Sequence, residues 1–144
     1  MNIPGIYKIE YILPGEIDAF DYSPGDTIDI SAYNNGTFTE LVFNETASLN
    51  SSMDKSEAGI LYEISTSFRK AGKNSTDLNE LVTLARRDHI YRMTDVNGKQ
   101  YLIGTTNNPA KFQFEEVNDQ DPTGYRGYNC SISWRSVNGI IYLA

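Results

Sequence analysis

The stretch HIYRMTDVNGKQYLIGT, residues His89 to Thr105, decides the fold class of this chain. Two runs rich in Tyr, Ile, Met and Leu flank an Asn97-Gly98 pair, and such side chains suit a half-buried, pleated strand. Asn-Gly favours a two-residue hairpin, because a type I′ turn needs positive φ at both central positions. The stretch therefore predicts a β-hairpin. In that register the facing pairs are Val96 with Lys99, Thr94 with Tyr101, and Met93 with Leu102.

Alternating apolar and polar residues predict further strands before and after this hairpin. Residues 5–13 are the clearest case, because Tyr7, Ile9 and Tyr11 share one face and Lys8 lies on the other. With the hairpin, these runs make about nine short strands, which is typical of a mainly β, antiparallel β-sandwich or barrel. The other predicted strands are residues 27–33, 38–44, 59–68, 110–117, 128–134 and 140–143.

One flanking α-helix is predicted over residues 76–87, next to the central hairpin. Asp77 is placed to cap it, and Glu80 can reach back to complete a capping box. Four apolar residues recur at helical spacing, so we expect one stripe of the helix to pack on the sheet. The residues of the stripe are Leu78, Leu81, Val82 and Ala85.

The longest polar stretch is ETASLNSSMDKSEA, residues 45–58. It is rich in Ser and carries charges of both signs, which predicts a long loop. A loop of this length inside a compact domain is usually functional or disordered. We find no linker and no internal repeat, so the 144 residues predict a single β domain over 1–144.

The chain is acidic, with a net charge of −7 and a pI near 4.6. A phosphate backbone needs Lys and Arg for neutralisation, so this charge argues against sequence-independent binding to nucleic acid. A single cysteine excludes an internal disulfide. The N-terminus lacks the basic and apolar regions of a signal peptide, and no window has the length of a membrane span, so we expect no membrane partner.

Few residues could carry catalysis. His89 is the only histidine, and its place between the predicted helix and strand indicates a structural role. Cys130 lies on the apolar face of its strand, which predicts a buried, inert thiol. One Cys and one His nearly exclude a zinc site, and Asp119-x-Asp121 has only the start of a calcium-loop pattern. We therefore expect no enzymatic activity, no catalytic residues, no metal and no cofactor.

Several short motifs resemble small structural proteins encoded in the tail regions of bacteriophages and prophages, notably those of Bacteroidetes. The motifs are Glu57-Ala58-Gly59 leading into a strand that ends Ser67-Phe68-Arg69, a short capped helix, and the run YRMTDVNGKQYLIG of residues 91–104. The chain is also similar, more loosely, to the tail-tube fold, a β-sandwich flanked by one helix with a long loop that reaches a neighbouring ring.

The resemblance implies a non-enzymatic protein of the virion tail, made in the cytoplasm of the bacterial host. It implies that copies of the chain form a homo-oligomeric ring, commonly of six, that stacks into a tail tube with other tail proteins. DNA would pass through the lumen without sequence-specific binding, which an acidic lumen would favour. The 45–58 loop would contact neighbouring copies, and the 90–104 hairpin would line the lumen or an interface. The predicted assembly residues are Ser48, Leu49, Asn50, Ser51, Ser52, Met53, Asp54 and Lys55.

Other functions remain open at this point. One is a tail-completion or head–tail joining ring protein. Another is a monomeric β-sandwich module that binds carbohydrate or a protein ligand through Tyr22, Tyr125 and Tyr128, beside the loop Asn118–Gly124. An enzyme with a carboxylate pair is a distant third. Two polar strand faces would line a wet channel or face bulk water, namely Thr27, Asp29 and Ser31, and Asn129, Ser131 and Ser133.

Overall fold

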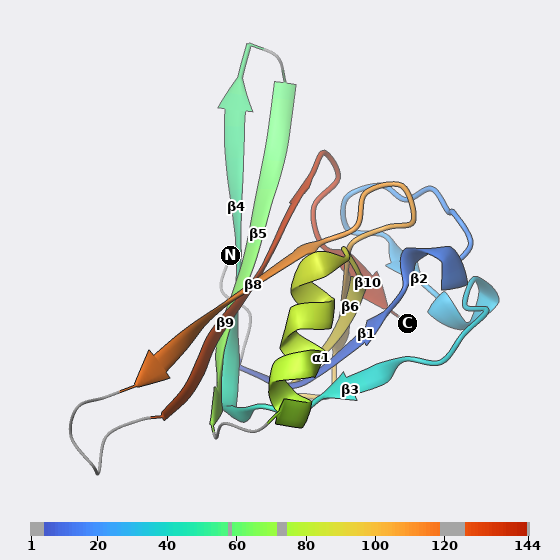
Figure 1. Ribbon diagram of the computed structural model, residues 1–144. Coiled ribbons are helices and arrows are strands. Elements are labelled where there is room, and N and C mark those ends of the chain that lie inside the picture. Colours follow the sequence, from blue (N-terminus) through green and yellow to red (C-terminus); the bar gives the residue numbers. More distant parts are fainter. Residues whose placement is uncertain (1–4, 58, 72–74, 119–125, 144) are drawn as a thin grey trace.

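The computed structural model describes residues 5–57, 59–71, 75–118 and 126–143. Within these residues, ten strands, one α-helix and two short 3-10 helices make up the regular structure (Figure 1). The helix α1 spans Ser75–Arg86, and the 3-10 helices span Pro14–Glu16 and Ile30–Ala32. The strands are β1 (Ile6–Ile12), β2 (Thr27–Ile28), β3 (Thr39–Leu41), β4 (Asn44–Ser56), β5 (Gly59–Ala71), β6 (Ile90–Asp95), β7 (Gln100–Ile103), β8 (Lys111–Asn118), β9 (Arg126–Ser136) and β10 (Ile141–Leu143).

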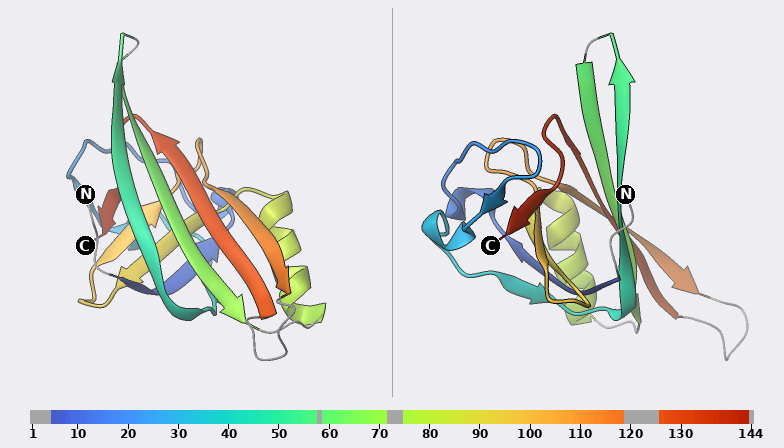
Figure 2. Two further views of the ribbon diagram at one scale, coloured as in Figure 1. Left: turned by 90° about the vertical axis from the view of Figure 1, so that its left-hand side faces the viewer. Right: turned by 180° about the vertical axis from the view of Figure 1, so that it is seen from behind.

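The ten strands belong to one sheet that folds over on itself. Its order is β2-β10-β7-β6-β1-β4-β5-β9-β8, with β3 beside β1, and all pairings are antiparallel except that of β10 with β2. At the fold line, β1 meets β4 through the single pair Ile6 and Ala47. This divides the sheet into a four-stranded half (β4, β5, β9, β8) and a second half (β2, β10, β7, β6, β1, β3). The halves face each other as in a sandwich, without closing into a barrel, so the predicted fold class is confirmed (Figure 2).

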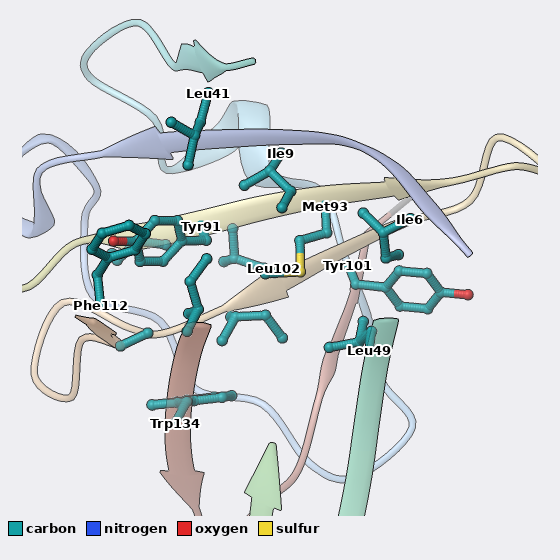
Figure 3. Close-up of a cluster of buried hydrophobic side chains, with 14 of the residues drawn as sticks. Ile6, Ile9, Leu41, Leu49, Tyr91, Met93, Tyr101, Leu102, Phe112 and Trp134 are labelled. Carbon is teal, nitrogen blue, oxygen red and sulfur yellow. The ribbon is translucent and has the colours of Figure 1, made fainter. Parts of the chain in front are cut away.

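The hydrophobic core lies between the two halves. Along β5, every second side chain from Ile64 onward is buried, and those between are exposed. This period of two is the pattern of a strand that buries one face. Figure 3 shows Leu49 and Trp134 of the four-stranded half on one side of the core and Ile6 and Met93 of the second half on the other. The core therefore holds the halves together mainly through side chains.

The segment between β1 and β4 covers the outer side of the second half (Figure 1 and Figure 2). Its Ile17 is buried, and the ring of Phe38 lies 4.1 Å from the guanidinium carbon of Arg92. Arg92 also donates two hydrogen bonds to the carboxylate of Glu10, at 3.1 and 2.8 Å. Among the described residues, the second half is thus covered on both sides, whereas the four-stranded half is covered only on its core side.

The central hairpin forms, but its register differs by one residue from the predicted one. β6 and β7 pair Met93 with Tyr101 and Thr94 with Gln100. The loop therefore has three residues rather than two, and the predicted facing pairs are wrong. A shift of one residue matters because it changes which side chains of the two strands share a face.

Asp95 accounts for the longer loop. Its Oδ1 accepts hydrogen bonds from the backbone N–H groups of Asn97 (2.8 Å) and Lys99 (3.0 Å), which stabilises the turn from the side chain. Gly98 then adopts the left-handed conformation, φ +83°, that closes a three-residue loop. The hydroxyl of Tyr101 donates to Oδ2 of Asp95 at 2.9 Å. The buried carboxylate thus joins the turn to the strands behind it.

The predicted strand 27–33 is wrong beyond Ile28. The carboxylate of Asp29 accepts hydrogen bonds from the N–H of Ser31 (3.1 Å) and from its hydroxyl (2.6 Å), and a 3-10 helix follows. Such local side-chain bonds compete with strand pairing. The predicted polar face of Thr27, Asp29 and Ser31 is therefore not a strand face.

Helix α1 begins one residue earlier than predicted, so Asp77 lies in its first turn and not at its cap. The buried residues of the helix are Leu81 and Leu84, whereas Leu78 is 40% exposed. The predicted stripe is thus only partly right. The helix packs beside β8 at the edge of the sheet, and there it buries a narrower stripe than it would over the middle of a sheet.

The prediction of a long loop over residues 45–58 is wrong. β4 occupies most of this stretch and pairs with β5 from Ser48 to Ser56 without a break in register. Ala47 and Leu49 are buried, and Ser48, Asn50 and Ser52 are exposed on the outward side. Ser and Asn have low strand propensity, but the cross-strand pairing and the burial of alternate residues outweigh it.

We predict that Asp95→Asn lowers the free energy of unfolding by about 1–3 kcal/mol near neutral pH, because it weakens charge-assisted hydrogen bonds inside the fold. Burial opposes the ionisation of Asp95, but hydrogen bonds from Tyr101, Lys99 and Asn97 hold its pKa below the ordinary value. The stabilisation is therefore complete above the unfolded pKa of about 3.9 and is lost as the pH falls through the folded value.

Urea denaturation of wild type and variant at about pH 7 and about pH 3 measures this effect. The difference in stability should shrink at the lower pH. Asp54→Asn changes an exposed carboxylate and should have no comparable effect at either pH. An Asp95→Asn difference of the same size at both pH values would contradict the prediction.

Candidate functional site

Two unpaired edges of the four-stranded half are the clearest candidate for a functional surface. In the described residues, β8 pairs in register only with β9, and β4 pairs with β5 and, at one residue, with β1. Unpaired edges present N–H and C=O groups that another strand can bind, and monomeric proteins usually protect them with prolines, bulges or charges. From Ser48 to Ser56, β4 has no proline and no bulge, and only Asp54 and Lys55 are charged. Among the described strands, only β5 pairs in register with this stretch of β4.

β4 and β5 continue as a hairpin beyond the rest of the sheet (Figure 1). β9 pairs with β5 only as far as Tyr62, whereas β4 pairs with β5 to its end. The core-facing side of this projecting hairpin, residues 53–62, extends past the core. Met53 and Ile60 on that side are consequently 56% and 45% exposed. Apolar side chains in such a position are available to a second molecule.

The four-stranded half also presents a polar face on the side away from the core. Ser, Asn and Gln dominate this face, and its described charges are three cationic and two acidic side chains. The surface is therefore hydrated and nearly balanced in charge. The residues of the polar face are Ser48, Asn50, Ser52, Glu63, Ser65, Ser67, Arg69, Lys111, Gln113, Glu115, Asn129, Ser131, Ser133 and Arg135.

The eight predicted assembly residues all lie on β4, along the open edge. Leu49 is 1% exposed and packs in the core, so it holds β4 to its own chain. The pattern that reveals this strand is present in the sequence, because apolar Ala47, Leu49 and Met53 recur at even spacing among the polar residues. Of the other predicted residues, Ser48, Asn50 and Ser52 belong to the polar face, Ser51 is half-buried on the core side, and Met53, Asp54 and Lys55 lie on the projecting hairpin.

The residues considered for catalysis occupy structural positions. Cys130 is buried on the core side of β9, as predicted, and this burial raises the pKa of its thiol to about 12, which leaves it protonated. His89 is buried between α1 and β6. In the part of the chain that the structure describes, no group of three or more His, Cys, Asp or Glu side chains could hold a metal ion. Asp119 and Asp121 lie outside the described residues.

A buried lysine ties helix α1 to the sheet. Lys70 is 6% exposed on the core side of β5, and its Nζ donates to the carbonyl oxygen of Val42 at 2.6 Å. The same Nζ lies 3.7 Å from Asp77 and 3.8 Å from Glu80 of the helix. Glu80 accepts a hydrogen bond from the hydroxyl of Tyr11 at 3.0 Å, and burial together with this bond raises the pKa of Tyr11 to about 12. These contacts fix α1 against β5 and β1.

The aromatic contact face of the alternative ligand-binding module is not formed by Tyr22 and Tyr128. Tyr128 is 2% exposed in the core. Tyr22 lies by the other end of β9, where its hydroxyl is 2.9 Å from the hydroxyl of Ser136. That part of the prediction is wrong, because alternation along β9 turns Tyr128 inward. Tyr125 and residues 119–124 of the loop lie outside the described residues.

The acidic residues gather away from the polar face. No Lys or Arg occurs between Lys8 and Lys55. Most carboxylates of this stretch lie on the segment that covers the second half of the sheet (Figure 1). The net charge of the chain is therefore not concentrated on the polar face. The carboxylates of the covering segment include Glu16, Asp18, Asp21, Asp26 and Asp29.

Comparisons with protein-family models, with curated proteins and with solved structures find no match to this chain. Within the described residues, no helix has the length and apolar character needed to cross a membrane. The functional argument therefore rests on the unpaired edges, the projecting hairpin and the polar face.

We predict that threonine at Ser65 and Ser133, a cross-strand pair on the polar face, stabilises the monomer by about 0.2–1 kcal/mol. Both positions are exposed, and Thr has the higher strand propensity. Chemical denaturation of the single and double variants measures the gain. Ser136→Thr is the matched control, because this hydroxyl is buried against Tyr22 and an added methyl group should destabilise the fold. If the free energy of unfolding does not rise in these variants, the two serines already contribute as much to stability as threonine would.

Proposed function

We propose that the chain is a non-enzymatic structural subunit that assembles into a ring through its four-stranded half. The observation that carries this proposal is that β4 and β8 border the four-stranded half on opposite sides, with no described ladder beyond β8 and only the pair Ile6 and Ala47 beyond β4. Pairing β8 of one copy with β4 of the next is a head-to-tail contact. Such contacts close into a ring when a whole number of the rotations between neighbouring copies adds up to a full turn. In such a ring each copy covers the edges of its neighbours.

Strand direction supports this pairing. The four strands β4, β5, β9 and β8 are antiparallel in succession, so β4 and β8 run in opposite directions. Rotation about an axis along the strands preserves these directions, and β8 then meets β4 of the next copy in the antiparallel sense. A ring of six copies, as the tail-tube resemblance implies, would hold about 24 strands, and barrels of 16–18 strands already enclose an aqueous channel.

The packing of the subunit decides which face would line the channel. The core side of the four-stranded half carries the second half of the sheet and the helix (Figure 2). Four strands occupy only about 19 Å of arc at their ordinary spacing, so these bulky parts have more room on the outer circumference. The polar face is then on the inside, and of the two alternatives for Asn129, Ser131 and Ser133, a channel or bulk water, this arrangement favours the channel.

This face suits a channel through which DNA slides. Neutral hydroxyl and amide groups hold water, and only three of the fourteen residues of the polar face are cations that could neutralise phosphates. The guanidinium of Arg135 lies 3.2 Å from the carboxylate of Glu63, which engages one of those cations. In this arrangement a nearly neutral lumen replaces the acidic one that the resemblance implied, and the carboxylates of residues 16–29 lie on the outside. DNA would pass without sequence-specific contacts.

The projecting hairpin would make the contact between stacked rings, in place of the predicted 45–58 loop. It extends along the strand direction, which would be the axis of the ring, and it exposes Met53 and Ile60. Stacked rings would form the tail tube of a virion, assembled with other tail proteins in the host cytoplasm. A single unstacked ring would instead suit a tail-completion or head–tail joining protein. The 90–104 hairpin lies within the second half, away from the channel.

Proline at the edge of β4 should block assembly without unfolding the subunit. Along an edge strand the N–H groups alternate between the partner strand and solvent, so one of Ser52→Pro and Met53→Pro removes an outward N–H and spares the pairing with β5. The informative variant is the one that keeps the circular dichroism and the urea midpoint of wild type.

Light scattering across a concentration series, with negative-stain images of the same samples, measures assembly. Rings or tubes are expected for wild type and for Ser65→Thr, which lies on the same sheet away from the edge. The folded proline variant should remain a monomer. Two results would contradict the proposal, a wild type that is monomeric at every concentration and a folded proline variant that still forms rings.

Shortening the projecting hairpin should separate ring formation from stacking. Met53 and Tyr62 are cross-strand partners, so replacing residues 54–61 by Asn-Gly joins them through a two-residue turn. The change retains the buried residues of the described core, and the stability should therefore match that of wild type. Electron microscopy should show single rings in place of tubes. Tubes of normal length would exclude the hairpin from the stacking contact.

A further inference from the structure

We infer that His89 forms an acid-sensitive latch between the two halves of the sheet. The inference concerns the fold of one copy, so it stands whether or not copies assemble. His89 is the only histidine of the chain, and histidine is the side chain whose ordinary pKa lies closest to neutral pH. The backbone of His89 also links the two halves of the sheet, so protonation of its side chain acts on that link.

Within the described residues, two backbone pairings join the halves of the sheet. One is the pair Ile6 and Ala47 at the fold line. The other is formed by His89, whose N–H donates to the carbonyl of Ala110 at 3.3 Å and whose carbonyl accepts from the N–H of Ala110 at 3.0 Å. His89 leads into β6 of the second half and Ala110 into β8 of the four-stranded half. The bridge thus links the start of β8, the last strand of the four-stranded half, to the start of β6 in the second half.

The imidazole of His89 is buried among aromatic rings. The residue is 3% exposed, and the rings of Tyr11 and Tyr91 lie 5.6 and 6.3 Å from its centroid. Its Nδ1 is 2.7 Å from the carbonyl oxygen of Arg87, so Nδ1 carries the proton and Nε2 is the atom that a second proton would bind. Glu80 of α1 reaches this group through the hydroxyl of Tyr11, and β8 contributes the backbone of the bridge.

Burial is the main influence on the titration of this residue. It lowers the pKa of His89 below the ordinary value, and the hydrogen bond to the carbonyl of Arg87 offsets part of the effect. The charges of Arg87 and Asp88 act in opposite directions. The neutral imidazole is therefore the form that fits the folded site.

The sign of the pH dependence follows from this difference. In the opened or unfolded chain the histidine takes its proton at about pH 6.5. The folded site takes it at a lower pH, so stability is complete above about 6.5 and is lost as the pH falls through the folded pKa. A charged imidazole leaves the aromatic site, and the backbone that carries it is the backbone of the bridge. Acid therefore opens the link between β6 and β8 before it opens the longer pairings of β5.

Hydrogen exchange measured by NMR tests the latch, with the amides of His89 and Ala110 as reporters. The amides of the β5–β9 pairing serve as the internal control, since ten residue pairs hold those strands together. After correction for the intrinsic pH dependence of exchange, protection of the reporters should fall about tenfold for each pH unit below 6.5, until the folded pKa is reached. The control amides should keep their protection over the same range.

Two variants separate titration from packing. His89→Asn retains a donor for the carbonyl of Arg87, and His89→Phe retains an aromatic ring, but neither takes a proton in this range. Both should give reporter protection that does not depend on pH. If neither variant folds, the NMR titration of the wild-type imidazole still decides. A His89 pKa at or above about 6.5 would overturn the inference, and so would an equal loss of protection in wild type and a folded variant.

Discussion

The structure depends on the burial of one face of the four-stranded half against the second half. In the described residues only two backbone pairings join these halves, at Ile6 with Ala47 and at His89 with Ala110. Side chains such as Leu49 and Trp134 must therefore supply most of the attraction between them, at about 1.5–3 kcal/mol for each large apolar side chain removed from water. The strict alternation of β4, β5 and β9 follows from this demand, since each strand has one face to bury.

Because of the same alternation, the side chains on the outer face of the four-stranded half do not contribute to the core. The second half is covered on its outer side, where Phe38 packs on Arg92. The four-stranded half carries serine, asparagine and glutamine on its outer side, although β-branched residues would suit the strands better. A surface that gives up strand propensity for hydration, on a sheet with two edges that strands of other copies could extend, is consistent with the proposed assembly.

Sequence patterns predict the local part of this fold and miss the part that depends on distant partners. β5 and β9 follow from a period of two within each strand, and Asn129, Ser131 and Ser133 lie on the outer face as that period requires. β1 forms as predicted, but a shift in register between Ile6 and Lys8 interrupts its alternation. Tyr7, predicted to share a face with Ile9, is 54% exposed. β4 is missed because its many polar residues obscure the even spacing of Ala47, Leu49 and Met53. The hairpin register depends on the side chain of Asp95 rather than on the Asn-Gly pair. Strand order is non-local, and so the edges at β4 and β8 could not be read from the sequence.

A sheet edge binds through backbone groups that nearly every residue possesses, so selectivity at such a site must come from direction, twist and length. β4 has 13 residues and β8 has eight. An edge-to-edge contact between copies can therefore cover only part of β4, even if β8 is used over its whole length. Which residues of β4 remain after such pairing depends on the register between copies, and the end of β4 that lies beyond β9 belongs to the projecting hairpin. In the proposed assembly, β4 would thus contribute to two contacts, one around the ring and one along its axis.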